Sequence, residues 1–149
     1  MFLKQGIEYA KNSKKFKTIS LLSFLYFFFS AGLWSVIPYL AKYVLHYDAK
    51  IQGAMVGMIG IGSISTGILF PYVRNKWDVN KIIPFLFFLS GLSIAGVLII
   101  KNQALILFLL LMIFGFSWAS AVSLFNAEIQ SLAAYSIHSA TPFHGFRHP

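Results

Sequence analysis

Four long apolar windows alternate along the chain with short polar stretches. Lys, Arg, Asp, Glu and His are all absent from residues 18–41, 51–73, 82–100 and 103–127. Each window matches the roughly 20 apolar residues that a helix needs to cross a bilayer. An ionised side chain at mid-membrane costs at least about 2.5 kcal/mol. Charge-free windows of this length therefore predict four transmembrane helices.

Two other fold classes fit the pattern poorly. Transmembrane barrels alternate apolar and polar residues, whereas residues 105–116 are apolar on every face. Core helices of a soluble protein rarely run this long without a polar side. We therefore predict an all-α integral membrane bundle of about four transmembrane helices. Its parts are a cytoplasmic amphipathic leader (1–17), a transmembrane region (18–127) with helices over about 18–45, 51–73, 82–100 and 104–127, and an unstructured cytoplasmic tail (128–149).

Composition and charge support this fold and orient it. The chain is 58% hydrophobic and 11% charged, where a soluble domain is about a quarter charged. Nine of the twelve Lys and Arg residues lie before the first window, between the second and third, or in the tail. The other three are Lys42, Lys50 and Lys101. By the positive-inside rule, both termini are expected on the cytoplasmic side of the membrane, which we expect to be a bacterial inner membrane. The net charge of +8 then faces lipid headgroups, and nucleic acid is not an expected partner.

The second window is rich in small residues. Small side chains allow close approach of helix backbones inside a membrane. Close helix packing is the interpretation we favour over direct ligand contact, with either an intramolecular partner or a second copy of the chain. The predicted packing residues are Gly53, Gly57, Gly60, Gly62 and Gly67. In the fourth window, by contrast, we expect Leu107 to face lipid.

Catalytic and metal-binding constellations cannot be assembled from this sequence. The four acidic residues, Glu8, Asp48, Asp78 and Glu128, lie at or beyond the ends of the windows, and cysteine is absent. His138, His144 and His148 fall in the predicted tail and only superficially resemble a metal-binding tract. We expect no enzymatic activity, no cofactor and no bound metal.

Several longer stretches resemble major facilitator superfamily transporters. They read FFFSAGLWSVIPYLAKYVL, GAMVGMIGIGSISTGILFPYVRNKWDVNKII and FSWASAVSLFNAEIQ. The likeness covers about residues 5–130 and is closest to the opening of the second six-helix half in the enterobactin-exporter-like branch. The superfamily's glycine-acid-basic loop falls where Arg74, Lys76 and Asp78 lie. Pro71 replaces the expected acid, which puts the usual charge-relay role of the loop in doubt.

The resemblance implies a partial major-facilitator-type half, a fragment of a small-molecule efflux transporter from a split or frameshifted gene, which does not transport alone. A companion transporter half or a homo-oligomer would complete it. Polar and aromatic side chains within the windows would then face a substrate cavity, although packing is the commoner role of such tryptophans. One alternative is a small membrane interaction protein. Another is a four-helix proton-coupled exporter, which the absence of ionisable residues within the windows disfavours. The cavity candidates are Trp34, Ser35, Ser117, Trp118 and Ser120.

Overall fold

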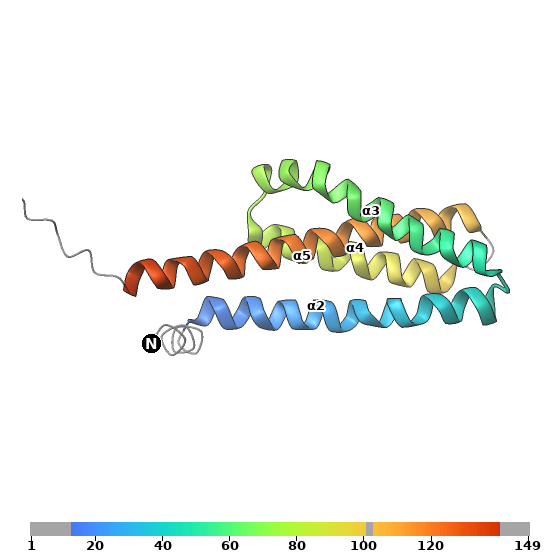
Figure 1. The fold of residues 1–149 in the computed structure, drawn as a ribbon, viewed down its shortest axis with the longest axis horizontal. Helices are drawn as coiled ribbons and strands as arrows, with labels where there is room; N and C mark the ends of the chain where they lie inside the picture. Colours follow the sequence, from blue (N-terminus) through green and yellow to red (C-terminus); the bar gives the residue numbers. More distant parts are fainter. Residues whose placement is uncertain (1–12, 101–102, 141–149) are drawn as a thin grey trace, which may run out of the picture.

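The computed structural model describes residues 13–100 and 103–140, with side chains described as far as Leu132. Within these ranges the chain forms four long helices. Figure 1 shows helix α2, its π-helical extension η1, and helices α3, α4 and α5. All four helices are long and apolar enough to cross a membrane, and no strand occurs in these ranges. The predicted all-α membrane bundle is confirmed. The bounds are α2 Lys14–Tyr39, η1 Leu40–Val44, α3 Ala49–Lys76, α4 Val79–Ile99 and α5 Ala104–Ala140.

Polar residues just before the apolar windows begin three of the helices. The Ser13 hydroxyl accepts a hydrogen bond from the Phe16 amide at 3.3 Å, and the Asp48 carboxylate accepts one from Ile51 at 3.0 Å. Such caps satisfy amide groups that the first helical turn leaves unpaired. Asp78 is the N-cap residue of α4, but its side chain makes no capping bond. These helices therefore begin a few residues before their charge-free windows.

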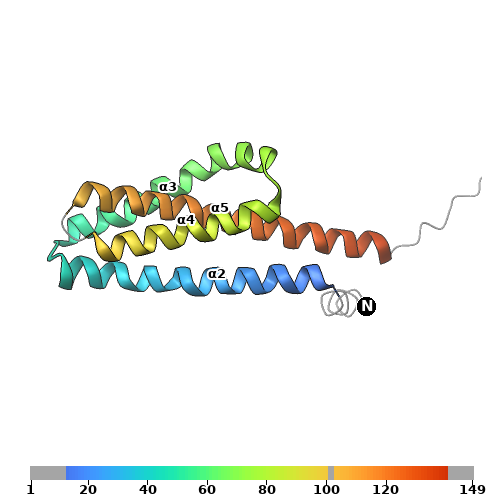
Figure 2. The ribbon, with the colours of Figure 1, turned by 180° about the vertical axis from the view of Figure 1, so that it is seen from behind.

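Three prolines, Pro38, Pro71 and Pro84, lie inside the described helices and each removes one α-helical hydrogen bond. Proline has no amide hydrogen to donate to the residue four positions earlier. After Pro38 the backbone widens into η1, where the Leu45 amide donates to the Leu40 carbonyl at 2.9 Å. Pro71 lies within α3, and the light-green end of that helix bends away from α5 in Figures 1 and 2. The C-terminal end of the first span thus departs from regular α-helix just after Pro38.

Helix α5 is the axis of the bundle. Both α3 and α4 pack along it, whereas α2 contacts its neighbours less extensively. In Figures 1 and 2, α2 runs beside α4 and α5 over most of its length. Buried apolar side chains form two clusters along this axis, and Trp118 of α5 packs against both. Leu107 belongs to the second cluster and is only 1% exposed, so the expectation that it faces lipid was wrong.

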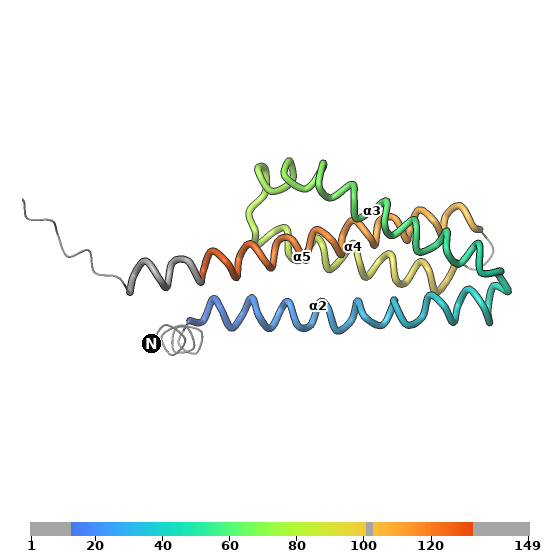
Figure 3. The backbone as a smooth tube through the Cα atoms, in the orientation of Figure 1, coloured from blue at the N-terminus to red at the C-terminus, as the bar shows by residue number. Residues whose placement is uncertain are grey.

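The helical part of α5 extends further than the sequence indicated. An unstructured tail was predicted from residue 128, but α5 continues to Ala140, as the ribbon in Figure 1 shows. In Figure 3 the coloured tube of α5 stays coiled as far as the grey segment. Residues 128–140 contain neither Gly nor Pro, and Ala, Leu, Glu and Gln favour helix. The apolar side chains end where the membrane span ends, but the helix itself can continue beyond that point. The expectations for residues 1–12 and 141–149 lie outside the described residues.

One glycine of α3 brings that helix against α5. A Cβ atom built on Gly62 would lie 2.8 Å from the Met112 carbonyl carbon and 2.9 Å from the Phe116 amide nitrogen. In the reverse direction, Gly115 would meet the backbone of Ile59 at 2.8 Å. Gly62 therefore lies where the backbones of α3 and α5 come close together. Nothing lies within 4 Å of a Cβ built on any of the other four: Gly53, Gly57, Gly60 and Gly67.

Helix geometry explains why these four glycines differ from Gly62. Successive residues are about 100° apart around a helix axis. The four therefore fall within an arc of about 80°, and Gly62 lies roughly opposite its centre. The expected packing role of the four is not met within this chain, because their side of α3 faces away from α5.

Candidate functional site

Three hydroxyl groups meet in the apolar interior, one each from α2, α4 and α5. The Tyr26 hydroxyl lies 2.6 Å from Ser90 Oγ and 3.3 Å from Ser117 Oγ. The two serine oxygens are 2.8 Å apart, and Ser117 donates to the Leu86 carbonyl at 2.9 Å. All three side chains are buried. The cluster joins α2 to the pair formed by α4 and α5.

The direction of each hydrogen bond in this cluster follows from counting the hydroxyl hydrogens. Each hydroxyl has one hydrogen and can also accept bonds. The hydrogen of Ser117 goes to the Leu86 carbonyl, because a carbonyl can only accept. Ser90 must then donate to Ser117, and Tyr26 must donate to Ser90. All three hydrogens are used in this arrangement, so Tyr26 has none left to offer, and the Ser30 hydroxyl is a further hydrogen-bond partner of Tyr26.

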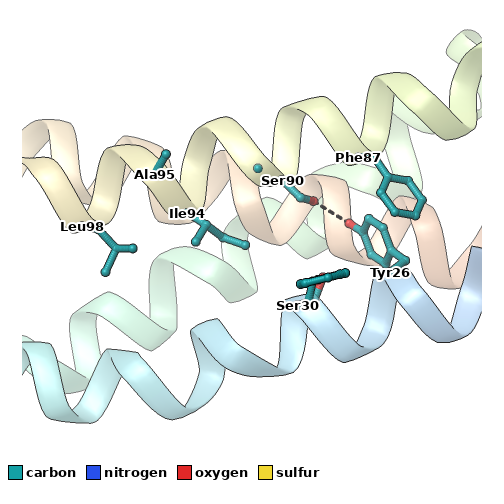
Figure 4. A pocket seen from close by; sticks show the side chains of 9 residues that line it. Tyr26, Ser30, Phe87, Ser90, Ile94, Ala95 and Leu98 are labelled. Carbon is teal, nitrogen blue, oxygen red and sulfur yellow. Dashed lines mark hydrogen bonds between the residues drawn. The ribbon is translucent and has the colours of Figure 1, made fainter.

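A cavity of about 420 Å³ lies beside this cluster, between α2 and α4. Figure 4 shows Tyr26 and Ser90 on its wall, joined by the dashed hydrogen bond, with Ser30 nearby. The rest of the wall is mostly apolar and includes Phe29 and Leu98, which are 66% and 47% exposed. The cavity therefore opens on the outside of the bundle. Its chemistry suits an apolar molecule that donates one hydrogen bond.

A second set of hydroxyl groups joins α3 to α5. Thr66 donates to the Phe116 carbonyl at 3.0 Å, and its Oγ1 lies 3.4 Å from Ser120 Oγ. Ser63 lies 3.2 Å from the Gly115 carbonyl oxygen. Thr66 and Ser120 are buried. These bonds lie beside the close contact at Gly62, and we interpret them as packing interactions.

The predicted cavity residues are not gathered into one site. Trp34 and Trp118 form an edge-to-face pair with ring centroids 6.0 Å apart. Ser35 is exposed and lies 3.4 Å from the Ala31 carbonyl of its own helix. Ser117 belongs to the Tyr26 cluster, and Ser120 bonds to Thr66. None of these five residues lines the 420 Å³ cavity.

The predicted cytoplasmic loop residues lie where α3 ends and α4 begins. Arg74 and Lys76 are in the last turn of α3, and Asp78 follows at the N-cap of α4. All three are exposed. Among the side chains described, one ion pair occurs, between Lys15 and Glu128 at 3.8 Å. No set of three His, Asp or Glu side chains in this part of the chain is arranged for a metal ion.

Sequence reasoning missed Tyr26, Ser30 and Ser90, the three polar members of the cavity wall. One signal pointed to Tyr26 and Ser90. Like Ser117, they lie well inside their charge-free windows, where lipid leaves a hydroxyl few partners other than a neighbouring helix. Polar groups at similar depth on different spans are therefore expected to meet. Tyr26 was overlooked because it lies in the run LYFFF, whose large apolar side chains suggest a lipid-facing stretch.

Comparison with known families extends these observations to the whole chain. A family model described as transmembrane secretion effector matches residues 2–140, which include all four helices. No curated protein sequence and no solved structure matches significantly. The family match agrees with the four apolar spans and with the likeness to major facilitator superfamily transporters. The chain is therefore an integral membrane protein that belongs to the transmembrane secretion effector family of this superfamily.

Proposed function

We propose that the protein is part of a small-molecule efflux transporter of the enterobactin-exporter-like branch. Helices α2 to α5 would correspond to the first four helices of the second six-helix half. The observation that carries this proposal is the family match over residues 2–140, which spans all four membrane helices. The protein would act in the bacterial inner membrane with both termini in the cytoplasm, and it would move its substrates without chemical change.

Transport would require a companion half or a second copy of the chain. In this superfamily the substrate site lies at the membrane midplane between two halves that move against each other. The described helices offer one wall of such a site. The exposed glycine side of α3 supports contact with a companion, because small residues allow another helix to come close.

The cavity between α2 and α4 is the part of the chain best suited to hold a small molecule. Its wall is apolar, and the Tyr26 oxygen offers an acceptor at the end of a fully used hydrogen-bond chain. We propose that it contributes to substrate binding. Trp34, Ser35, Trp118 and Ser120 would serve mainly in helix packing or at the surface toward the companion.

A chimera tests the proposed function. Residues 14–132 would replace the corresponding four helices of an intact enterobactin-exporter-like transporter, and substrate export would be measured in a strain that lacks this transporter. Restored export supports the proposal. The same chimera with Gly62→Leu is the matched negative control, because that substitution cannot fit against α5. A chimera that inserts and folds but never exports would favour the alternative, a membrane interaction protein without transport activity.

The requirement for a companion needs its own experiment. The purified chain alone would be placed in proteoliposomes with an imposed proton gradient and a panel of dyes and siderophore-like compounds. We expect no gradient-dependent movement. Movement that Tyr26→Phe abolishes would show that this chain transports by itself, because Tyr26 lines the proposed substrate cavity.

A further inference from the structure

The cavity of about 420 Å³ beside Tyr26, called the Tyr26 cavity from here on, has a buried polar end and an exposed apolar end. Its three hydroxyl-bearing residues, Tyr26, Ser30 and Ser90, are 2%, 2% and 4% exposed. Phe29 and Leu98 line the same cavity and are exposed. In Figure 4, Leu98 lies at the opposite end of the lining from Tyr26. A molecule in this cavity therefore meets hydrogen-bonding groups inside the bundle and apolar side chains at the mouth.

The mouth of the cavity lies at the middle of the membrane spans. Gly91 is exposed, lines the cavity and is ten residues from both Lys81 and Lys101 in the sequence. Phe29 is twelve and thirteen residues from the nearest lysines on either side. A span has about 20 residues, and charged side chains avoid its centre. The mouth therefore faces the hydrocarbon of the membrane and neither water phase.

The seam between α2 and α4 stays open to lipid in the described part of the chain. Every residue that lines the Tyr26 cavity belongs to one of these two helices. In Figures 1 and 2, α2 and α3 lie on opposite sides of α5. A companion that packs on the exposed glycine side of α3 would therefore leave the mouth uncovered.

Two small residues on α4 keep one edge of the mouth wide. Gly91 and Ala95 are one turn apart, and both are exposed and line the cavity. A Cβ atom built on Gly91 would meet nothing within 4 Å, so the space beside it is free. The opposite edge of the mouth is formed by Phe29 of α2. Side chains at Gly91 and Ala95 therefore determine what can pass between the two helices.

We propose that the Tyr26 cavity binds molecules dissolved in the membrane, which enter sideways between α2 and α4 and carry a hydroxylated aromatic head and an apolar tail. The head lies against the rings of Tyr26, Phe29 and Phe87, which favour contact with another aromatic ring. Its hydroxyl group donates to the polar end, because the Tyr26 and Ser90 hydrogens are already donated. A hydroxyl group in hydrocarbon lacks such a partner, so binding is favoured. The tail remains in the lipid outside the mouth.

The biological meaning of this inference rests on the proposed substrate role of the cavity, but its test needs no transport. Binding of 4-ethylphenol, 4-butylphenol and 4-octylphenol to the full-length chain would be measured in nanodiscs. Affinities are expressed per probe dissolved in the bilayer, from partitioning into protein-free nanodiscs. We expect them to agree within about twofold, because the tail stays in hydrocarbon and gains nothing per methylene on binding. A progressive fall beyond this range, or no binding of any probe, would overturn the proposal.

A charged probe separates entry from the membrane from entry from water. The compound 4-hydroxybenzenesulfonate has the same phenol head, with a permanent charge in place of the tail. At equal total concentration it should bind at least about tenfold more weakly than 4-ethylphenol, because its charge would lie at mid-membrane. Equal binding would show that the cavity is reached from water, and lateral entry would be wrong.

Substitutions at the mouth and one matched control locate the path. Gly91→Leu and Ala95→Leu should each weaken binding of all three alkylphenols at least about tenfold, because they fill the opening. Gly32→Leu is the control, since Gly32 is also an exposed helical glycine with nothing within 4 Å of an added Cβ but does not line the cavity. It should bind as the unmodified chain does.

The two mouth variants also protect the test against a failure to fold. If Gly91→Leu does not give monodisperse protein, Ala95→Leu decides, and unchanged binding in the folded mouth variants would refute the path past Gly91. Failure of this inference can be distinguished from failure of the proposed function. A chain that binds the probes as expected but exports nothing in the chimera would contradict only the proposed transport.

Discussion

Gly62 of α3 lies directly against the backbone of Met112 in α5, with space for no more than a hydrogen atom between them. The nearest atoms to an added Cβ belong to the main chain, which cannot rotate aside as a side chain can. Any larger residue must therefore push the two helices apart. The nearby bonds from Thr66 and Ser63 to α5 depend on the same short separation.

Gly62→Ala should destabilise the bundle by about 1–3 kcal/mol, the usual range for overpacking of a well-packed interior. The measurement is the yield of monodisperse protein in mild detergent, together with unfolding in a denaturing detergent. Gly60→Ala is the matched control, since nothing lies within 4 Å of its added Cβ. Equal losses in both variants would contradict the role of the Gly62 contact.

The hydroxyl cluster of Tyr26, Ser90 and Ser117 should respond to substitution as one unit. Removing one member leaves a buried partner unpaired, and removing a second costs little more. We expect Tyr26→Phe and Ser117→Ala each to lower the free energy of unfolding by about 1 kcal/mol. The double variant should lose clearly less than the sum. Simple additivity in a double-mutant cycle would show that the two hydroxyls do not depend on each other.

The spans could be predicted from the sequence because a segment's ability to cross the membrane depends on the summed transfer free energies of its own side chains. Each charge-free window avoids the cost of placing a charge in hydrocarbon, and this holds whatever the neighbours are. The role of an individual residue depends on its direction. Gly60 and Gly62 are two positions apart and have similar environments in the sequence, yet one faces away from the bundle and the other meets α5.

The candidate site was harder to predict for the same reason. Trp34 and Trp118 attracted attention as large polarisable side chains away from span ends, and they pack against each other. Tyr26 and Ser90 are 64 positions apart, and only the arrangement of α2 beside α4 brings them together. With a nearly uniform apolar surface on every span, periodicity gave no means to determine which side of α2 faces α4.

Orientation in the membrane is open to a direct test. We expect reporter fusions after Lys17 and Lys81 to report a cytoplasmic location and a fusion after Lys50 to report the periplasm. The reason is the unequal distribution of Lys and Arg between the two sides. The fusions control one another, because adjacent connections must give opposite signals. A periplasmic signal after Lys81 would contradict the predicted orientation.

The hydrogen-bond polarity of the Tyr26 cavity predicts a preference among ligands of the same shape. We expect 1-naphthol, which can donate a hydrogen bond, to bind the full-length chain about fivefold more tightly than 1-methoxynaphthalene, which can only accept one; this ratio corresponds to about 1 kcal/mol. The measurement is equilibrium binding to the chain in nanodiscs. Tyr26→Phe should remove the preference, because it deletes the accepting oxygen while leaving the aromatic wall. Tyr39→Phe is the matched control, since Tyr39 is exposed near the far end of α2 and does not line the cavity. Tighter binding of the ether that persists in a Ser30→Ala variant would mean that a hydroxyl hydrogen of the Tyr26 cluster is free in the cavity, and the order of donation from Tyr26 through Ser90 to Ser117 would then be wrong.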